Sequence, residues 1–371
     1  MQISEQGVLN SGDAGSPRAV TTFPTVLPLR DGTLLASYRV GSGKDTDDEA
    51  IELRRSSDGG RTWSVPAAPF STTFEGRRGS FKVLYLSAME GNRILGSTLW
   101  VDRQAHPGKP LFNDQTEGCL PMEVLLTESH DLGQTWTPWR NVPMPAEIGP
   151  PSLTSPVLKF PSGRLALSIE TNKTYHDQSQ WFQRVVYCYS DDNGKTWGSP
   201  QVSLQDPTAR IFHWDQRAAV APDGRLVTFT WTYDRQTTKY LNVHRRISRD
   251  EGRTWTAGED LGFADQPSIP AIFPDGRTVV AWVDRFGSQS IRARMSQSID
   301  APLPAGSEVT LFSRQPAPQS NLANTGDLLA EMGFWTYGLP FAAALPDGDA
   351  LVVYYAGTEK QMQARWARLK L

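Results

Sequence analysis

One eight-residue pattern, Ser-x-Asp-x-Gly-x-Thr-Trp, constrains the fold of this chain more than any other feature. The aspartate can accept hydrogen bonds from turn amides, the glycine permits a positive φ, and the tryptophan packs between strands. Because the same five letters recur at intervals, they indicate an array of similar units rather than a set of unrelated domains. The four copies occupy residues 56–63, 129–136, 190–197 and 248–255.

A second repeat alternates with the first and consists of short apolar runs broken by a turn glycine. Each copy predicts a β-hairpin. Six copies in 371 residues leave roughly 60 residues for each, which is enough for a four-stranded antiparallel blade. We therefore expect one all-β domain over residues 1–371, a six-bladed β-propeller of four-stranded antiparallel blades. The turn glycines are Gly32, Gly91, Gly163, Gly224, Gly276 and Gly348.

The order of strands in such blades separates two rims. The last blade shows only three strands before Leu371, so residues 7–11 are predicted to supply its fourth strand and close the ring. In an up-and-down blade the glycine hairpins and the Ser-x-Asp turns lie on one rim. Variable loops on a rigid scaffold usually carry function, so the chemistry is expected on the opposite rim.

Composition excludes several classes of partner. Lysine and arginine number 37 against 40 acidic residues, so the chain lacks the basic surplus that nucleic-acid binding requires. No apolar run approaches the roughly 20 residues that span a bilayer, and we expect no membrane partner. The first residues show no basic and apolar export signal, which predicts a cytoplasmic location for the sequence as given. The partner expected instead is a carbohydrate, and the oligomeric state is left open.

Neither cysteines nor histidines form a recognisable site. Cys119 and Cys188 lie far apart and are expected to be buried thiols. The five histidines show no metal-ligand spacing, so we expect no metal and no cofactor.

The repeated turn is known as an Asp-box, and the chain resembles the sialidase (neuraminidase) superfamily, whose six-bladed propellers carry these turns away from the active site. Residues 23–36 and 53–63 are similar to the opening of bacterial exo-sialidases. The resemblance implies an exo-glycoside hydrolase that removes a terminal, acidic, sialic-acid-like sugar. It also implies three arginines around the sugar carboxylate, an aspartate acid/base and a tyrosine nucleophile paired with a glutamate.

These roles can be carried over only in part. The family's first arginine is absent from residues 22–24, which read Thr-Phe-Pro, and Arg18 and Arg39 are the nearest substitutes. By its position in the sequence, Arg285 is nearest to the place of the family's third arginine. The mid-chain glutamate is absent from residues 152–155, and Glu170 is the best alternative.

The acid and the nucleophile have candidates at the two ends of the chain. In the acidic loop 39–49, Asp45 or Asp47 is the candidate acid, because crowded carboxylates raise at least one pKa. The alternative is a solvated acidic loop. Tyr337 is the candidate nucleophile and Trp335 a neighbouring substrate contact, although Tyr337 could equally be a packing aromatic.

Further polar residues are expected on the same rim. Two segments that begin inner strands share Asp-Gln, and several outgoing strands end in Asp-Arg. Such arginines could form an anion clamp, or could simply pair with the neighbouring aspartates. The candidates are Asp215 for catalysis and His176, Arg217, Arg235, Asp265 and Arg285 for substrate binding.

Three other functions are compatible with the same residues. An exo-arabinanase-like glycosidase would use the carboxylates Asp45, Glu170 and Asp215. A uronate-directed lyase would use Tyr337 or His213 as base. A non-catalytic carbohydrate-binding propeller would bind sugar without turnover.

Overall fold

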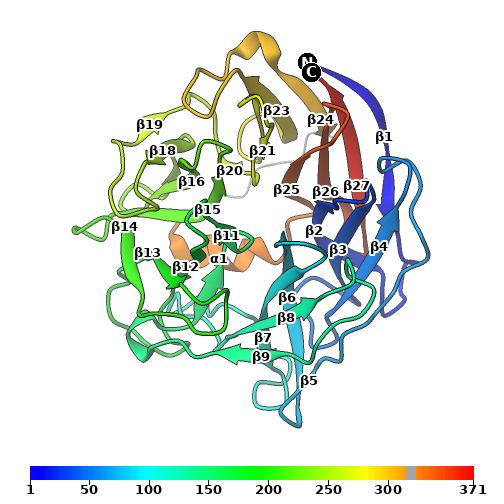
Figure 1. The fold of residues 1–371 in the computed structure, drawn as a ribbon. Coiled ribbons are helices and arrows are strands. Elements are labelled where there is room, and N and C mark those ends of the chain that lie inside the picture. Colours follow the sequence, from blue (N-terminus) through cyan, green and yellow to red (C-terminus); the bar gives the residue numbers. More distant parts are fainter. Residues whose placement is uncertain (315–322) are drawn as a thin grey trace.

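The computed structural model of the protein describes residues 1–314 and 323–371. Within these residues the strands form five sheets that stand around a central axis like the blades of a propeller (Figure 1). Neighbouring strands within the sheets run antiparallel, except where β27 meets β2. The protein is therefore an all-β propeller, and the prediction of an all-β fold is confirmed.

The largest sheet has seven strands and falls into two parts. The two parts meet through one parallel pair, Val20 with Met362. The first part contains β1 (Gln2–Asn10), β25 (Tyr337–Ala344), β26 (Ala350–Thr358) and β27 (Gln361–Lys370). The second part contains β2 (Val20–Pro28), β3 (Leu34–Gly41) and β4 (Ala50–Ser56).

Each of the other four sheets has five strands. One contains β5 (Thr73–Phe74), β6 (Arg77–Ala88), β7 (Ile94–Asp102), β8 (Glu123–Ser129) and β9 (Arg140–Val142). The next contains β10 (Pro151–Leu153), β11 (Leu158–Lys159), β12 (Leu165–Thr171), β13 (Arg184–Ser190) and β14 (Gln201–Gln205). Then follow β15 (Ile211–Val220), β16 (Leu226–Asp234), β17 (Lys239–Tyr240), β18 (His244–Ser248) and β19 (Glu259–Asp260). The last contains β20 (Gln266–Pro267), β21 (Ala271–Ile272), β22 (Thr278–Asp284), β23 (Ser290–Ser296) and β24 (Val309–Ser313).

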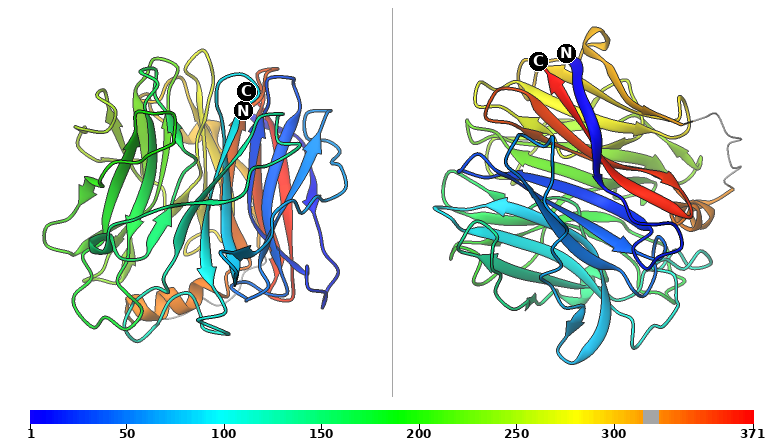
Figure 2. Two further views of the ribbon diagram at one scale, coloured as in Figure 1. Left: turned by 60° about the horizontal axis from the view of Figure 1, so that its bottom comes forward. Right: turned by 90° about the vertical axis from the view of Figure 1, so that its right-hand side faces the viewer.

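The two chain ends pair with each other. Strand β1 runs antiparallel to β27, from Gln2 opposite Lys370 to Asn10 opposite Ala364, and the termini lie side by side (Figures 1 and 2). This confirms that the leading segment completes the last set of strands, and the pairing extends further toward the N-terminus than residues 7–11. The two cysteines are free and buried, as expected.

The four Ser-x-Asp turns share one geometry. In each turn the serine hydroxyl donates to the aspartate at 2.7 to 2.8 Å. The threonine hydroxyl donates to the same carboxylate at 2.5 to 2.6 Å. The predicted Asp-box turns are therefore present as four equivalent local structures, centred on Asp58, Asp131, Asp192 and Asp250.

Contacts between turns confirm that the Asp-boxes and the glycine hairpins share a rim. Arg368 donates to Asp349, beside the last hairpin glycine, at 2.7 Å, and to the carbonyl of Gly59 in the first Asp-box at 3.1 Å. Arg93, beside another hairpin glycine, donates to Asn193 in the third Asp-box at 2.6 Å.

A bulge interrupts four of the inner strands. In β2, β6, β15 and β25 the pairing register with the next strand shifts by one residue. In each strand the shift lies four or five residues before the end of the strand, where the glycine hairpin begins. Bulges of this kind bend a strand and redirect side chains that would otherwise follow its alternation. The left-handed backbone at Phe23 (φ 51°), Asp215 (φ 46°) and Leu339 (φ 44°) marks three of the bulges.

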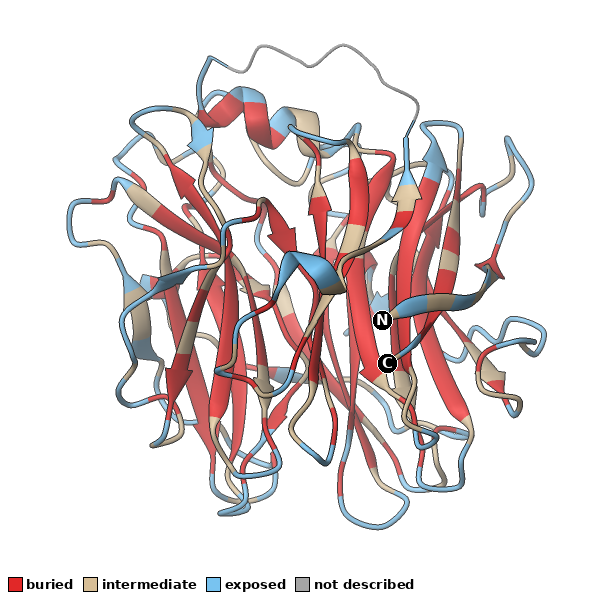
Figure 3. Cartoon of the chain, turned by 90° about the horizontal axis from the view of Figure 1, so that it is seen from above, coloured by how far each residue is buried: buried red, intermediate tan, exposed pale blue. Residues whose placement is uncertain are grey.

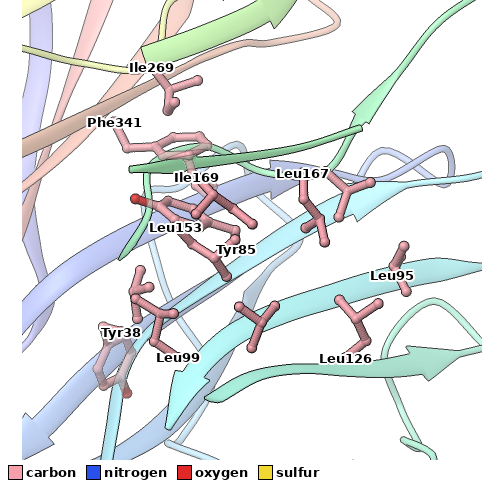
Figure 4. Packing of buried hydrophobic residues seen from close by; sticks show 14 of the residues in the cluster. Tyr38, Tyr85, Leu95, Leu99, Leu126, Leu153, Leu167, Ile169, Ile269 and Phe341 are labelled. Atoms are coloured by element: carbon pink, nitrogen blue, oxygen red, sulfur yellow. The ribbon is translucent and has the colours of Figure 1, made fainter. Parts of the chain in front are cut away.

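The apolar core lies between neighbouring sheets, and the strands are mostly buried (Figure 3). Around the axis, side chains from different sheets converge, among them Tyr85, Leu99, Leu153, Ile169 and Phe341 (Figure 4). This packing holds the inner strands, and the bulges on them, in fixed positions.

A short helix, α1 (Thr325–Met332), was not expected from the sequence. It begins at Asn324, whose side chain accepts a hydrogen bond from the amide of Asp327. The helix lies across one end of the propeller (Figures 2 and 3), where its buried Leu328 and Leu329 pack on a cluster of aromatic side chains. Two 3-10 turns, Ala146–Ile148 and Ala305–Ser307, complete the helical structure of the described residues. None of the helices in the described residues has the length and apolar character needed to cross a bilayer.

Candidate active site

A cavity of about 260 Å³ lies at the end of the strands opposite the Asp-box rim, beneath α1. Its wall is formed by the loop that follows β3, by the end of β12, by the inner-strand bulges and by α1. Pockets for drug-sized ligands begin at roughly 300 Å³. The cavity is therefore suited to one small ring rather than to a chain of several.

The bulges supply much of the lining. Five of the residues that the bulges remove from regular pairing face the cavity. Since a left-handed residue costs free energy, it persists only where the surrounding structure holds it, and such residues gather at functional sites. The five are Phe23, Lys82, Val83, Asp215 and Leu339.

Two carboxyl groups from neighbouring sheets meet in this cavity. Glu170 lies near the end of β12, is 7% exposed, and accepts a hydrogen bond from the amide of Gln216 at 3.1 Å. Burial, together with the negative charge of Asp215, raises the pKa of Glu170 well above its usual value. This environment favours the protonated form of Glu170.

Asp215 has a different environment. Arg217 lies 3.0 Å from its carboxylate, and the side-chain amide of Gln266 donates to its other oxygen. The two carboxyls therefore lie in different surroundings, Glu170 buried without a cation partner and Asp215 beside a guanidinium and an amide donor. Acid-assisted glycoside cleavage uses two carboxyl groups whose environments differ in this way.

Each of the three arginines that line the cavity is paired with an acid of this chain. Arg39 lies 3.2 Å from Glu49, a side chain with no exposed surface. Arg217 is bound to Asp215, and it also donates to the hydroxyl of Tyr85 at 2.8 Å.

Arg285 is bound in the same way. Its guanidinium lies 3.1 Å from Asp265, donates to Gln266 at 2.6 Å, and covers the ring of Trp335 at 3.9 Å. Burial raises the pKa of Asp265 to about 6, against the pull of Arg285.

Asp45 lines the cavity but is held by two cations. Lys82 lies 2.7 Å and Arg103 2.8 Å from its carboxylate, and the amide of Leu111 donates to it at 2.6 Å. Although burial opposes it, Lys82 and these other partners lower the pKa of Asp45. Asp45 is therefore a poor proton donor at neutral pH.

Lys44 connects the loop after β3 to α1. Its Nζ donates to the carbonyls of Met332, at 2.6 Å, and Trp335, at 3.1 Å, and to the hydroxyl of Tyr355 at 3.1 Å. Burial and the positive charges of Arg285 and Arg39 lower the pKa of Lys44 well below its usual value. This side chain fastens the helix over the cavity.

An aromatic cluster forms the remaining wall. Trp214 stacks on Tyr233 at 4.9 Å, and Trp231 stacks on Tyr240 at 4.5 Å. Trp335 continues the cluster at 5.7 Å from Trp231 and places the apolar face of α1 against it. The cavity therefore has a polar floor with the two carboxyls and an apolar, aromatic side.

Comparison with known proteins gives relatives over nearly the whole chain, although no known family profile matches it. A sialidase from Micromonospora viridifaciens is 28% identical over an alignment of 377 positions, gaps included, that covers 96% of this chain and 52% of the relative. A sialidase from Bacteroides fragilis is 25% identical over an alignment of 271 positions that covers 68% of this chain and 46% of the relative. The chain spans about half the length of these curated relatives.

Solved structures of sialidase-like proteins share the fold of this chain. An intramolecular trans-sialidase from Ruminococcus gnavus superposes with a TM-score of 0.65 at 14% identity, over 98% of this chain and 97% of the other. The chain is a distant relative of sialidases and has the propeller fold of their superfamily. A protein of unknown function from Dyadobacter fermentans superposes with a TM-score of 0.71 at 21% identity, over 100% of this chain and 99% of the other. These similarities identify the fold of this chain and leave its reaction open.

In this sialidase-superfamily propeller, seven of the thirteen residues predicted for the site line the cavity. Three of them are arginines from different sheets, three are carboxyl groups, and one is an aromatic residue between α1 and β25. They are Arg39, Asp45, Glu170, Asp215, Arg217, Arg285 and Trp335.

Two of the predicted catalytic residues and one binding residue lie behind or beside the cavity. Tyr337 is 3% exposed and packs against Phe312 with ring centroids 5.5 Å apart, outside the lining. Asp47 accepts from the amide of Gly108 at 2.9 Å. Asp265 stands behind Arg285 and orients it.

The other three lie further away. Arg18 is half-exposed and pairs with Glu52 on β4. Arg235 pairs with Glu117 at 2.7 Å. His176 is exposed, with its ring against Tyr175 at 5.1 Å.

Several lining residues had no signal that the sequence alone could supply. Lys44 and Lys82 sit in an acidic loop and an apolar strand, and Tyr355 lies within β26. Gln266 belongs to one of the Asp-Gln pairs, of which only the aspartate was predicted as a site residue. Trp231 precedes one of the Asp-Arg strand ends, and a tryptophan also precedes Asp102-Arg103 and Asp284-Arg285, so this recurrence was a usable pattern.

Proposed function

We propose that this protein is an exo-acting glycoside hydrolase that removes a single terminal sugar and uses Glu170 and Asp215 as its carboxyl pair. The observation that carries the proposal is the buried Glu170, with its raised pKa, beside Asp215, which is paired with Arg217, in a cavity with room for one small ring. The sialidases among its relatives, which are glycosidases by name, support the same reaction class.

The chemistry follows from the different environments of the two groups. Glu170 gives its proton to the glycosidic oxygen as the bond from that oxygen to the anomeric carbon breaks. Water adds to the anomeric carbon, and Asp215 takes the proton that the water loses. The proton then passes from Asp215 to Glu170 and restores the starting state.

The scaffold supports cleavage at the end of a glycan. If the seven-stranded sheet is divided at its single parallel pair, it becomes two blades, and the chain is a six-bladed propeller in one domain over residues 1–371. The innermost strands of the blades then surround the cavity, and α1 covers one side. A closed wall of this kind admits a chain end more easily than the middle of a chain.

The test is hydrolysis of a panel of fluorogenic terminal sugars by wild type, Glu170→Gln and Tyr337→Phe. We expect Glu170→Gln to lose activity by about a hundredfold or more, and Tyr337→Phe to stay within a few fold of wild type. Loss of activity in Tyr337→Phe with retention in Glu170→Gln would favour the tyrosine route that the superfamily resemblance implies. Sugar binding with no turnover on any substrate of the panel would make the protein a binding propeller.

A further inference from the structure

Resting on the proposed function, we propose that the cavity takes a neutral terminal sugar with an apolar substituent, of the 6-deoxyhexose class, and disfavours an acidic sugar. This differs from the expectation of an acidic, sialic-acid-like substrate. Two observations carry it, the internal pairing of the lining cations and the apolar wall beneath α1.

The first observation concerns charge. A site that grips a carboxylate offers guanidinium donors that are free to form two parallel hydrogen bonds. Here Arg39, Arg217 and Arg285 each have a carboxylate of the chain within 3.2 Å. Their other guanidinium hydrogen bonds go to Thr22, Tyr85, backbone carbonyls and Gln266. Of their donors, only the single Nε–H groups of Arg217 and Arg285 are buried without a partner among the described residues, and one such donor cannot form the two parallel bonds.

The two lining lysines are likewise engaged. Lys82 lies 2.7 Å from Asp45 and 2.5 Å from Glu49. Lys44 donates to two carbonyl oxygens and to Tyr355. An anionic sugar would have to displace a buried acid from its partner, and leaving that acid unpaired costs more than the new contact gains.

The second observation concerns shape. Leu329, Ala330 and Met332 of α1 face the cavity, as do Leu111 and Phe112 from the loop after β7. A hydroxyl placed against such a wall would lose its hydrogen bonds to water without replacement, whereas a methyl group would not. A site discriminates against groups that it leaves unpaired in this way.

These two features act on different parts of one ring. The carboxyl pair, Glu170 and Asp215, addresses the anomeric carbon and the glycosidic oxygen. The apolar wall then accommodates the substituent at the far side of the ring, and the paired arginines line the remainder with little net charge. A 6-deoxyhexose fits the carboxyl pair with its anomeric carbon, the apolar wall with its methyl group and the paired arginines with its uncharged ring.

The experiment combines turnover with binding, so that the two proposals fail separately. Wild type is assayed on the methylumbelliferyl glycosides of L-rhamnose, L-fucose, D-galactose, D-glucuronic acid and N-acetylneuraminic acid. Binding of the five free sugars to Glu170→Gln is measured by isothermal titration calorimetry. We expect a 6-deoxyhexose to exceed both acidic sugars by about tenfold or more in kcat/KM and in affinity.

The outcomes distinguish the inference about the sugar from the proposal of a glycosidase. Faster cleavage or tighter binding of an acidic sugar, or of D-galactose, overturns the inference and leaves the glycosidase proposal standing. Preferred binding of a 6-deoxyhexose without cleavage of any glycoside supports the inference and overturns the glycosidase proposal. Absence of both binding and cleavage overturns the inference and, for these sugar classes, the function.

A variant tests the charge argument directly. Asp265→Asn keeps one of the two oxygens that accept from the amides of Gln266 and Arg285, and it removes the negative charge beside Arg285. We expect it to bind D-glucuronic acid or N-acetylneuraminic acid about tenfold more tightly than the parent protein does. If Asp265→Asn fails to fold, Glu49→Gln makes the same test at Arg39. Unchanged affinity for both acids in a folded variant would contradict the role given to the paired arginines.

Discussion

The two rims of this propeller are built in opposite ways. On the Asp-box rim, four turns repeat the same hydrogen bonds within eight consecutive residues, with distances that agree to about 0.1 Å. On the cavity rim the lining groups share no repeated local structure. Glu170 comes from the end of one strand, Asp215 from a bulge in another and Lys44 from a loop. The rim with the repeated turns stabilises the fold, whereas the rim with the varied side chains forms the candidate site.

The largest effect is expected from the cavity rim. Glu170→Gln removes the proton donor, so kcat should fall about 10² to 10⁴-fold, as for other general acids. The isosteric amide keeps the shape and carries no charge, so stability should not fall. Steady-state kinetics and urea unfolding check both expectations.

The matched control is Glu147→Gln, at an exposed glutamate outside the cavity. It should keep wild-type kinetics. A Glu170→Gln protein with wild-type kcat would show that the cavity rim does not carry the reaction through this carboxyl.

The second prediction compares how the two rims respond to acid. Burial lowers the pKa of His213, on the inner strand β15, to about 3, with Arg246 and His244 opposing its charge and Asp206 favouring it. The unfolded chain binds this proton near pH 6.5, so the stability from neutral His213 is present above pH 6.5 and is lost as pH falls toward 3. Between pH 7.5 and 5 the loss should be about 2 kcal/mol.

The measurement is the free energy of unfolding in urea for wild type and His213→Gln at both pH values. Between pH 7.5 and 5, the difference in the free energy of unfolding between wild type and His213→Gln should change by about 2 kcal/mol. The difference between wild type and Asp58→Asn should stay constant over the same pH range. Hydrogen bonds from Thr62 and Ser56 outweigh burial and lower the pKa of Asp58 to about 2, so its contribution is lost only below pH 4. Equal pH responses of the two variants would contradict the assignment.

A third prediction concerns α1, which belongs only to the cavity rim. Lys44→Met removes three hydrogen bonds between the loop after β3 and the segment around α1. We expect KM to rise about tenfold with a smaller change in kcat, because the wall of the cavity loosens while the carboxyl pair stays in place. Lys370→Met, at an exposed position at the end of β27, is the control and should leave KM unchanged. A fall in kcat with constant KM would place Lys44 in the chemical step instead.

The smallest effect is expected on the Asp-box rim. Asp58→Ala removes hydrogen bonds to Ser56 and Thr62 in a mostly exposed turn, which should cost about 1 kcal/mol. Because three equivalent turns remain and the cavity is at the other end of the strands, kcat/KM should not change. Thermal unfolding and kinetics on one preparation check this, and an unchanged melting temperature would contradict the structural role of the turn.

Residues that act on their near neighbours in the chain were predictable from the sequence. The hairpin glycines Gly32, Gly163 and Gly348 have the positive φ that their turns require, and the Asp-boxes form as expected. The pairing of the chain ends was predictable as well, since a set of three strands at the end of a closed ring lacks one partner. The all-β propeller follows from these local signals repeated along the chain.

The cavity was only partly predictable. Glu170 and Asp215 were chosen because they end or begin strands on the correct rim, and the structure brings them together. Tyr337 and Arg235 were chosen by the same reasoning, yet one is packed against Phe312 and the other is paired with Glu117. Position along a strand identifies the rim but not the direction of the side chain.

Sequence by itself determined the repeating turns, the hairpins, the closure of the ring and hence the propeller, because each depends on hydrogen bonds and packing between residues of one short motif or between adjacent strands. Tertiary structure alone decided the site. A bulge turned Asp215 into the cavity, and burial together with Asp215 of the next sheet raised the pKa of Glu170. Asp265, 20 residues earlier in the chain, neutralised Arg285 across neighbouring strands, and α1 supplied an apolar wall. A protonation state depends on burial and on charges that come from distant parts of the chain, and no local pattern contains them.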